Sequence, residues 1–157
     1  MRTLSKKTQY SLRALNALTR HYGHGPVLIS RLSEDEAIPK KFLELILLDL
    51  KNRGVVESKK GKGGGYFLVR RPEEITLGSV IRMIDGPLAP LPCASETAFR
   101  RCDECHDEKT CGTRLVMKEV RDAIAHILDH TTLADVVRKV DSAREHSARA
   151  EPMLYYI

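Results

Sequence analysis

The sequence of 157 residues has no tryptophan, five tyrosines and three phenylalanines, so any hydrophobic core must be mainly aliphatic. It also lacks a run of about 18 consecutive apolar residues, the length that a membrane-spanning helix requires. The first residues, 1–7, are polar and do not match the apolar stretch of a signal peptide. We therefore expect a cytoplasmic protein that makes no contact with a membrane.

Cysteine is absent from most of the chain as well. The four cysteines are Cys93, Cys102, Cys105 and Cys111, all in one short stretch. In a protein that is not exported, clustered cysteines favour metal or redox chemistry over a disulfide framework. The sequence contains no Ser/His/Asp set and no carboxylate pair in a catalytic context. We therefore expect neither an enzyme nor a small-molecule substrate.

Positive charge is concentrated in the first half of the chain. The whole chain carries a formal charge of +5, but residues 1–86 carry +7 and residues 87–157 carry −2. A first half that is basic on its own is typical of a surface that binds phosphate groups. Charge alone is equally compatible with a solvated basic surface.

Helical periodicity in residues 6–22 predicts a first helix, which the breaker at residues 23–26 ends. A short helix over residues 30–36 and a third helix over residues 39–52 follow, with Pro39 at the first helical position. Two short helices joined by a tight turn are typical of the helix-turn-helix motif.

A glycine-rich basic stretch, residues 59–65, separates two short apolar segments at residues 55–58 and 66–69. This pattern predicts a β-hairpin, the wing of a winged helix-turn-helix domain. A further short helix is expected over residues 76–84. The predicted fold class is therefore mainly α with a small β-hairpin, in which a winged helix-turn-helix domain precedes a long dimerisation helix.

Four regions are expected along the chain: the winged domain over residues 1–86, a cysteine-bearing sensor loop over 87–112, dimerisation helices over 113–141 and a tail over 142–157. The long amphipathic pattern of residues 113–130 predicts a helix that packs against a partner helix. The last helix is expected to fray over residues 142–150, and the tail ends in an apolar segment, residues 153–157.

Candidate contacts with double-stranded DNA come from three places. Lysines in the first turn of the third helix can donate to guanine, and Glu44 can accept from cytosine. Lysines and glycines of the wing can approach phosphates closely. The full set is Ser5, Lys6, Pro39, Lys40, Lys41, Glu44, Lys59, Lys60, Lys62, Gly63, Gly64 and Tyr66. The alternative for the helix is exposed lysines with a surface ion pair.

On these motifs the sequence resembles the IscR/NsrR/RirA family of bacterial iron–sulfur transcription regulators. The matching stretches are residues 10–15, 61–66, 72–78, 84–86 and 132–135, and the resemblance covers residues 1–138. It implies a homodimer formed through the helix over residues 113–130, which binds a pseudo-palindromic operator. It also implies a [2Fe–2S] or [4Fe–4S] cluster in the cysteine loop, near the partner's DNA-binding domain.

The ligand pattern departs from the family. Cys93, Cys105 and Cys111 match its cysteine ligands, whereas Cys102 is additional. Arg114 stands where IscR-like members often have a histidine ligand, and Gln9 stands where NsrR-like members have a carboxylate. The simplest ligand set is therefore the four thiolates of Cys93, Cys102, Cys105 and Cys111, with His106 as a spare ligand.

Two alternatives to an iron–sulfur cluster remain open for the four thiols. They could hold a tetrahedral Zn²⁺, although the chain has only one Cys-x2-Cys pair. They could also form a thiol–disulfide switch if Arg100, Arg101 and Lys109 lower the thiol pKa. We rank the cluster first, and expect a dimeric regulator whose operator affinity follows redox, nitric oxide or iron status.

Overall fold

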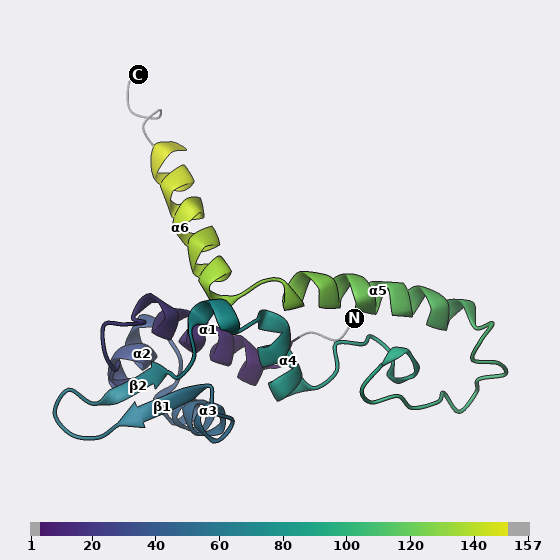
Figure 1. The fold of residues 1–157 in the computed structure, drawn as a ribbon, viewed down its shortest axis with the longest axis horizontal. Coiled ribbons are helices and arrows are strands. Elements are labelled where there is room, and N and C mark those ends of the chain that lie inside the picture. The colour runs from purple at the N-terminus through teal and green to yellow at the C-terminus, as the bar shows by residue number, and fades with distance from the viewer. Residues whose placement is uncertain (1–3, 151–157) are drawn as a thin grey trace.

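Helices dominate the computed structural model, which describes residues 4–150. The helices are α1 (Lys6–Arg20), α2 (Ile29–Asp35), α3 (Lys40–Asn52), α4 (Leu77–Asp85), α5 (Gly112–Asp129) and α6 (Leu133–Ala150), with 3-10 turns η1 (Pro72–Glu74) and η2 (Pro92–Ala94). The strands β1 (Val56–Lys59) and β2 (Gly65–Leu68) form one antiparallel hairpin. The predicted fold class is confirmed: a winged helix-turn-helix domain precedes a long helix, α5 (Figure 1).

The core of the winged domain is aliphatic, as the scarcity of aromatic residues requires. Helix α1 contributes an alanine and leucine face, and α3 contributes a face of leucine and isoleucine. The fully buried large side chains are Leu15, Leu18, Leu32, Ile38, Leu43, Ile46, Leu47, Leu50, Val55, Val56, Ile75 and Leu133. Burying this apolar surface is the main favourable contribution to folding.

Side-chain caps define where two of the helices, α1 and α4, begin. The Ser5 hydroxyl accepts a hydrogen bond from the Thr8 N–H at 3.1 Å and starts α1. Thr76 caps α4 in the same way, through the Ser79 N–H at 3.2 Å. Pro39 is the N-cap of α3 and not its first helical residue, one position from the expectation. Its missing N–H costs nothing there, because no partner is needed.

The wing is attached to the helix-turn-helix by a short bridge. Val27, which precedes α2, exchanges two backbone hydrogen bonds of 2.8 Å with Tyr66 of β2. The neighbouring Gly65 has φ +145°, and a Cβ there would collide with the Val27 carbonyl. Glycine at this position therefore lets the hairpin lie against the segment before α2, which fixes the direction of the wing.

Helix α6 differs from the expectation. It continues to Ala150, where we expected a frayed segment after residue 141. Its first residue, Leu133, is 0 % exposed in the core of the winged domain. The Leu133 N–H donates to the Ile75 carbonyl, and the Leu77 N–H donates to the Thr131 carbonyl, both at 2.9 Å. The apolar segment at residues 153–157 lies outside the described residues.

Helix α5 extends away from the winged domain and carries the cysteine loop at its far end (Figure 1). At the near end, the Arg82 guanidinium of α4 donates two hydrogen bonds, of 2.5 and 2.8 Å, to the Asp129 carboxylate. This contact lowers the pKa of Asp129. A Cβ at Gly78 would collide with the same carboxylate, so glycine permits the close approach of α4. No helix between residues 4 and 150 could cross a bilayer.

Truncation of Leu133 tests the attachment of α6. The variant Leu133→Ala should lower the free energy of unfolding by about 2–5 kcal/mol, because it leaves a cavity in the core. Urea denaturation measures this. Leu28→Ala is the control, since Leu28 is 56 % exposed and its truncation should cost no more than about 0.5 kcal/mol. Equal effects of the two substitutions would contradict the buried position of Leu133.

Candidate functional site

The candidate residues at the start of α3 lie at the surface. Pro39, Lys40, Lys41 and Glu44 are all exposed on the first turns of the helix. Phe42 is 37 % exposed and packs edge-on against Tyr10 with ring centroids 5.6 Å apart. The outward face of α3 therefore begins with polar side chains that can donate to or accept from a base edge.

The wing presents its lysines to solvent. Lys59, Lys60, Lys62 and Gly63 are exposed, whereas Gly64 is buried within the turn and Tyr66 is half-buried beside Val27. Gly64 and Tyr66 therefore have structural roles in shaping the hairpin. Any contact that they make with DNA stays a prediction.

The lysines at the start of α3 and on the wing have no ion-pair partner among the described residues. Within residues 4–150 no carboxylate forms an ion pair with Lys40, Lys41, Lys59, Lys60 or Lys62. Two other lysines of the domain do have partners: Lys7 pairs with Asp49 at 2.7 Å, and Lys51 pairs with Glu57 at 2.8 Å. Positive charge that has no partner in the described part of the chain is available to phosphate groups.

The start of α1 has partners within the protein. The Ser5 side chain caps the helix, and the Ser5 backbone N–H donates to the Asp85 carboxylate at 2.9 Å. Lys6 is exposed at the first helical position. Ser5 thus ties α1 to the end of α4, and its contact with a phosphate remains a prediction.

All four cysteines line one cavity of about 490 Å³ at the far end of α5. Cys102 is exposed, the other three are partly buried, and all four are free thiols. His106 and Arg114 also line this cavity. Among the described residues no three Cys, His, Asp or Glu side chains converge into a metal-binding group. The donors thus share a cavity without surrounding a common centre.

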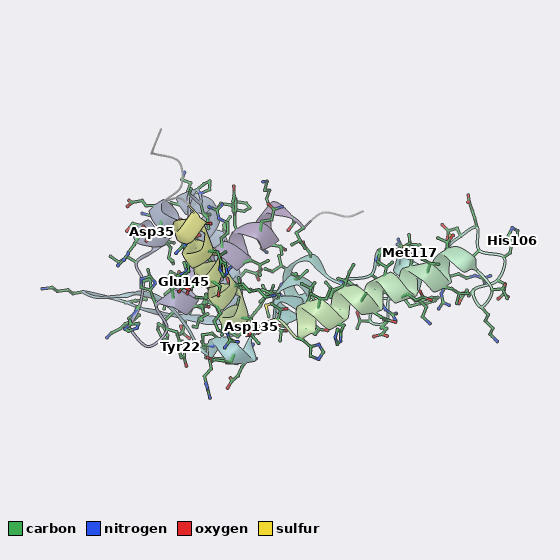
Figure 2. All side chains as sticks on the ribbon, turned by 90° about the horizontal axis from the view of Figure 1, so that it is seen from above. Tyr22, Asp35, His106, Met117, Asp135 and Glu145 are labelled. Carbon is green, nitrogen blue, oxygen red and sulfur yellow. The ribbon has the colours of Figure 1, made fainter. Side chains whose placement is uncertain are left out.

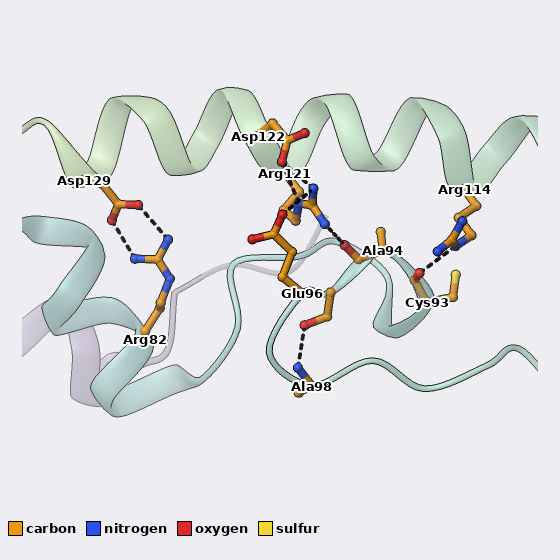
Figure 3. Close-up of polar contacts among 10 residues, drawn as sticks. Arg82, Cys93, Ala94, Glu96, Ala98, Arg114, Arg121, Asp122 and Asp129 are labelled. Carbon is orange, nitrogen blue, oxygen red and sulfur yellow. Dashed lines mark hydrogen bonds and ion pairs between the residues drawn. The ribbon is translucent and has the colours of Figure 1, made fainter. Parts of the chain in front are cut away.

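Two arginines of α5 hold the cysteine loop, and the sequence did not reveal either role (Figure 3). The Arg114 side chain donates to the Cys93 carbonyl at 2.8 Å and to the Glu108 carbonyl at 3.0 Å. Its guanidinium lies 5.7 Å from the centroid of the Phe99 ring. Arg114 therefore ties the first cysteine residue to the segment that contains the last two.

Arg121 is the second of these arginines and is only 8 % exposed. It donates to the Ala94 carbonyl at 2.6 Å and pairs with Asp122 at 2.5 Å and Glu96 at 3.1 Å. A buried guanidinium needs this number of partners to offset the loss of hydration. In the sequence, the one indication of this role was that Arg121 interrupts the apolar helical pattern of residues 113–130.

The surroundings of Cys105 do not activate its thiol. Burial and the neighbouring Cys111 raise the pKa of Cys105, and the nearby Arg101 only partly opposes them. The nucleophilic form of cysteine is the thiolate, so a raised pKa reduces its reactivity at neutral pH.

Comparison with known proteins decides the family. The family model described as Rrf2, iron-dependent transcriptional regulator, matches residues 4–139. The chain belongs to the Rrf2 family. An rrf2-like HTH-type transcriptional regulator from Rhodobacter capsulatus is 40 % identical over 137 residues, which cover 85 % of this chain and 91 % of that relative.

Solved structures of Rrf2-like regulators have the same fold. The structure of CymR, the global cysteine regulator of B. subtilis, has a TM-score of 0.74 at 29 % identity and covers 88 % of this chain and 98 % of its own. IscR of T. potens has a TM-score of 0.72 at 28 % identity and covers 99 % and 97 %. This Rrf2 chain is therefore a DNA-binding helix-turn-helix transcriptional regulator and not an enzyme.

Substitution of Arg114 tests how this Rrf2 regulator holds its cysteine loop. Arg114→Gln removes charge-assisted hydrogen bonds to two carbonyls, each worth about 1.5–3 kcal/mol. Residues 93–111 should then exchange amide hydrogens at least about tenfold faster, as hydrogen exchange with mass spectrometry would measure. Arg100→Gln, at an exposed position of the same loop, should change nothing. Equal exchange in both variants would contradict the role of Arg114.

Proposed function

We propose that this chain is a homodimeric regulator that acts in the cytoplasm on a pseudo-palindromic operator. Its affinity for this operator is set by an iron–sulfur cluster held by Cys93, Cys102, Cys105 and Cys111. The observation that carries the proposal is the common cavity lined by these four thiols. The same helix, α5, bonds to the cysteine loop at one end and to the DNA-reading domain at the other.

The chemistry of the donor set fits such a cluster. Four thiolates complete the coordination of a [2Fe–2S] or a [4Fe–4S] centre. The thiols do not converge among the described residues, so the loop would have to draw together to hold one. Arg114 and Arg121 would keep it against α5 meanwhile. When bound, the cluster would supply one-electron redox chemistry and sensitivity to oxygen, nitric oxide or iron shortage.

The exposed apolar side chains of α5 support a homodimer. Leu115, Val116 and Ile127 are all exposed on this helix. Apolar side chains that repeat along one helix favour burial against a partner. A two-fold axis through α5 would place the two copies of α3, the reading helices, at a fixed spacing, which is what a pseudo-palindromic operator requires.

The length of α5 explains why a dimer matters for signalling. His106 of the cysteine loop lies at one end of the molecule, and Tyr22 and Asp35 of the winged domain lie at the other (Figure 2). A change in the loop therefore cannot reach α3 of the same chain by direct contact. It would act along α5, or on the winged domain of the second copy, and so change the tilt of the reading helices.

A thiol–disulfide switch is the second candidate. It is favoured by the four free cysteines that line one cavity. The raised pKa of Cys105 disfavours it. Zinc bound by the four thiolates ranks third, because it would give stability without a redox signal.

Metal and sulfide analysis separates the three candidates. Protein purified without oxygen should be brown and contain iron and acid-labile sulfide. Cys105→Ser should lose both, whereas Ser95→Ala, a substitution in the same loop outside the ligand set, should retain them. A colourless protein that stays free of iron after anaerobic reconstitution would reject the cluster. Zinc found by elemental analysis would then indicate a structural site, and absence of both metals would favour the disulfide switch.

Removal of one wing lysine tests the proposed phosphate contacts. Lys60→Ala should weaken binding to every duplex, and should reduce the slope of log affinity against log salt by about one. Titration of labelled duplex at several salt concentrations measures both. Lys139→Ala, at an exposed position of α6, should leave the slope unchanged. An unchanged slope in Lys60→Ala would mean that the wing does not contact the DNA backbone.

A further inference from the structure

Helix α3, which is proposed to enter the major groove, carries two leucines on its outward face. Leu45 is 63 % exposed and Leu48 is 52 % exposed, whereas the leucines and isoleucine of the opposite face are buried. With about 100° of rotation per residue, Leu45 and Leu48 share the outward side of α3 with Lys41. Nothing in the packing of the winged domain requires large apolar side chains there.

The charge around these leucines restricts what can cover them. Lys40 and Lys41 lie on the preceding turn of α3, and Lys59, Lys60 and Lys62 lie on the wing, all exposed and without a carboxylate partner in the described part of the chain. A protein surface that docked here would have to be strongly acidic. The exposed apolar side chains of α5, through which a second copy is proposed to bind, belong to another element.

A polyanion that also offers an apolar contact fits both observations. The major groove of DNA exposes one sizeable apolar group, the 5-methyl group of thymine. We propose that Leu45 contacts a thymine methyl group in the operator and is thereby a specificity-determining residue. The inference rests on the proposed role of α3 as the helix that enters the major groove.

The spacing of Lys41 and Leu45 along α3 predicts where in the operator the contacted thymine should lie. Leu45 follows Lys41 by one helical turn, about 6 Å along the axis. Base pairs are about 3.4 Å apart. The thymine read by Leu45 should therefore lie one or two base pairs from the base that Lys41 contacts, and should occur once in each half-site.

Replacement of thymine by uracil tests this directly, because uracil pairs in the same way but lacks the methyl group. The full-length wild-type protein would first enrich duplexes from a randomised library. Each thymine of the best duplex would then be replaced by deoxyuridine, one at a time, and affinities of wild type and Leu45→Ala would be measured. In each half-site, one of these single replacements should weaken wild-type binding about fivefold, in line with partial burial of one leucine.

The variant should lose its sensitivity to the same replacement. Leu45→Ala removes the contact in both half-sites of the homodimer, so it should bind the thymine duplex about 25-fold more weakly than wild type, and it should bind the thymine and uracil duplexes equally. Leu45→Met, which keeps an apolar side chain, should retain the preference for thymine. Leu28→Ala removes another exposed leucine, at the start of α2, and should behave as wild type in the uracil scan.

Other outcomes overturn the inference in distinguishable ways. Wild-type protein that enriches a sequence but is insensitive to every uracil replacement would reject the methyl contact alone. So would a Leu45→Ala variant that loses affinity equally on both duplexes, or one that instead changes the oligomeric mass measured by light scattering. Wild-type protein that enriches no sequence would overturn the proposed function together with this inference.

Discussion

The contact between Arg82 and Asp129 is the constraint on which the arrangement of the two halves depends. It joins α4 of the winged domain to the last turn of α5 through two hydrogen bonds. Gly78 makes room for this contact. Backbone hydrogen bonds of Thr131 and Leu133 with the segment at the start of α4 hold the connection between α5 and α6. The orientation of α5, and with it the place of the cysteine loop, follows from this junction.

The order of elements could be predicted from the sequence because each has a strong local signal. Apolar periodicity marked α1 and α3, and the glycine-rich basic stretch between two apolar segments marked the hairpin. The continuation of α6 to Ala150 could not be predicted in the same way. Its polar second half has no apolar pattern, and its first turn is held by tertiary contacts of Leu133 with a segment nearly sixty residues earlier.

The candidate site could be predicted where the type of residue alone indicates the chemistry. Four cysteines in one loop indicate a thiol or metal site wherever they fold. The arginines that hold the loop were not predictable, since hydrogen bonds from Arg114 to backbone carbonyls leave no trace in composition. The outward position of Leu45 does follow from the helical period, because Leu43, Ile46, Leu47 and Leu50 occupy the buried face.

Helix α5 is also a lever. Its 18 residues span about 27 Å at 1.5 Å per residue, from Asp129 at the winged domain to the cysteine loop, which Arg114 and Arg121 hold. A tilt of roughly five degrees at Asp129 moves the far end by about 2 Å, which is comparable with small helix shifts at allosteric interfaces. A displacement of about 2 Å at the cysteine loop therefore corresponds to a rotation of only roughly five degrees where α5 meets the winged domain.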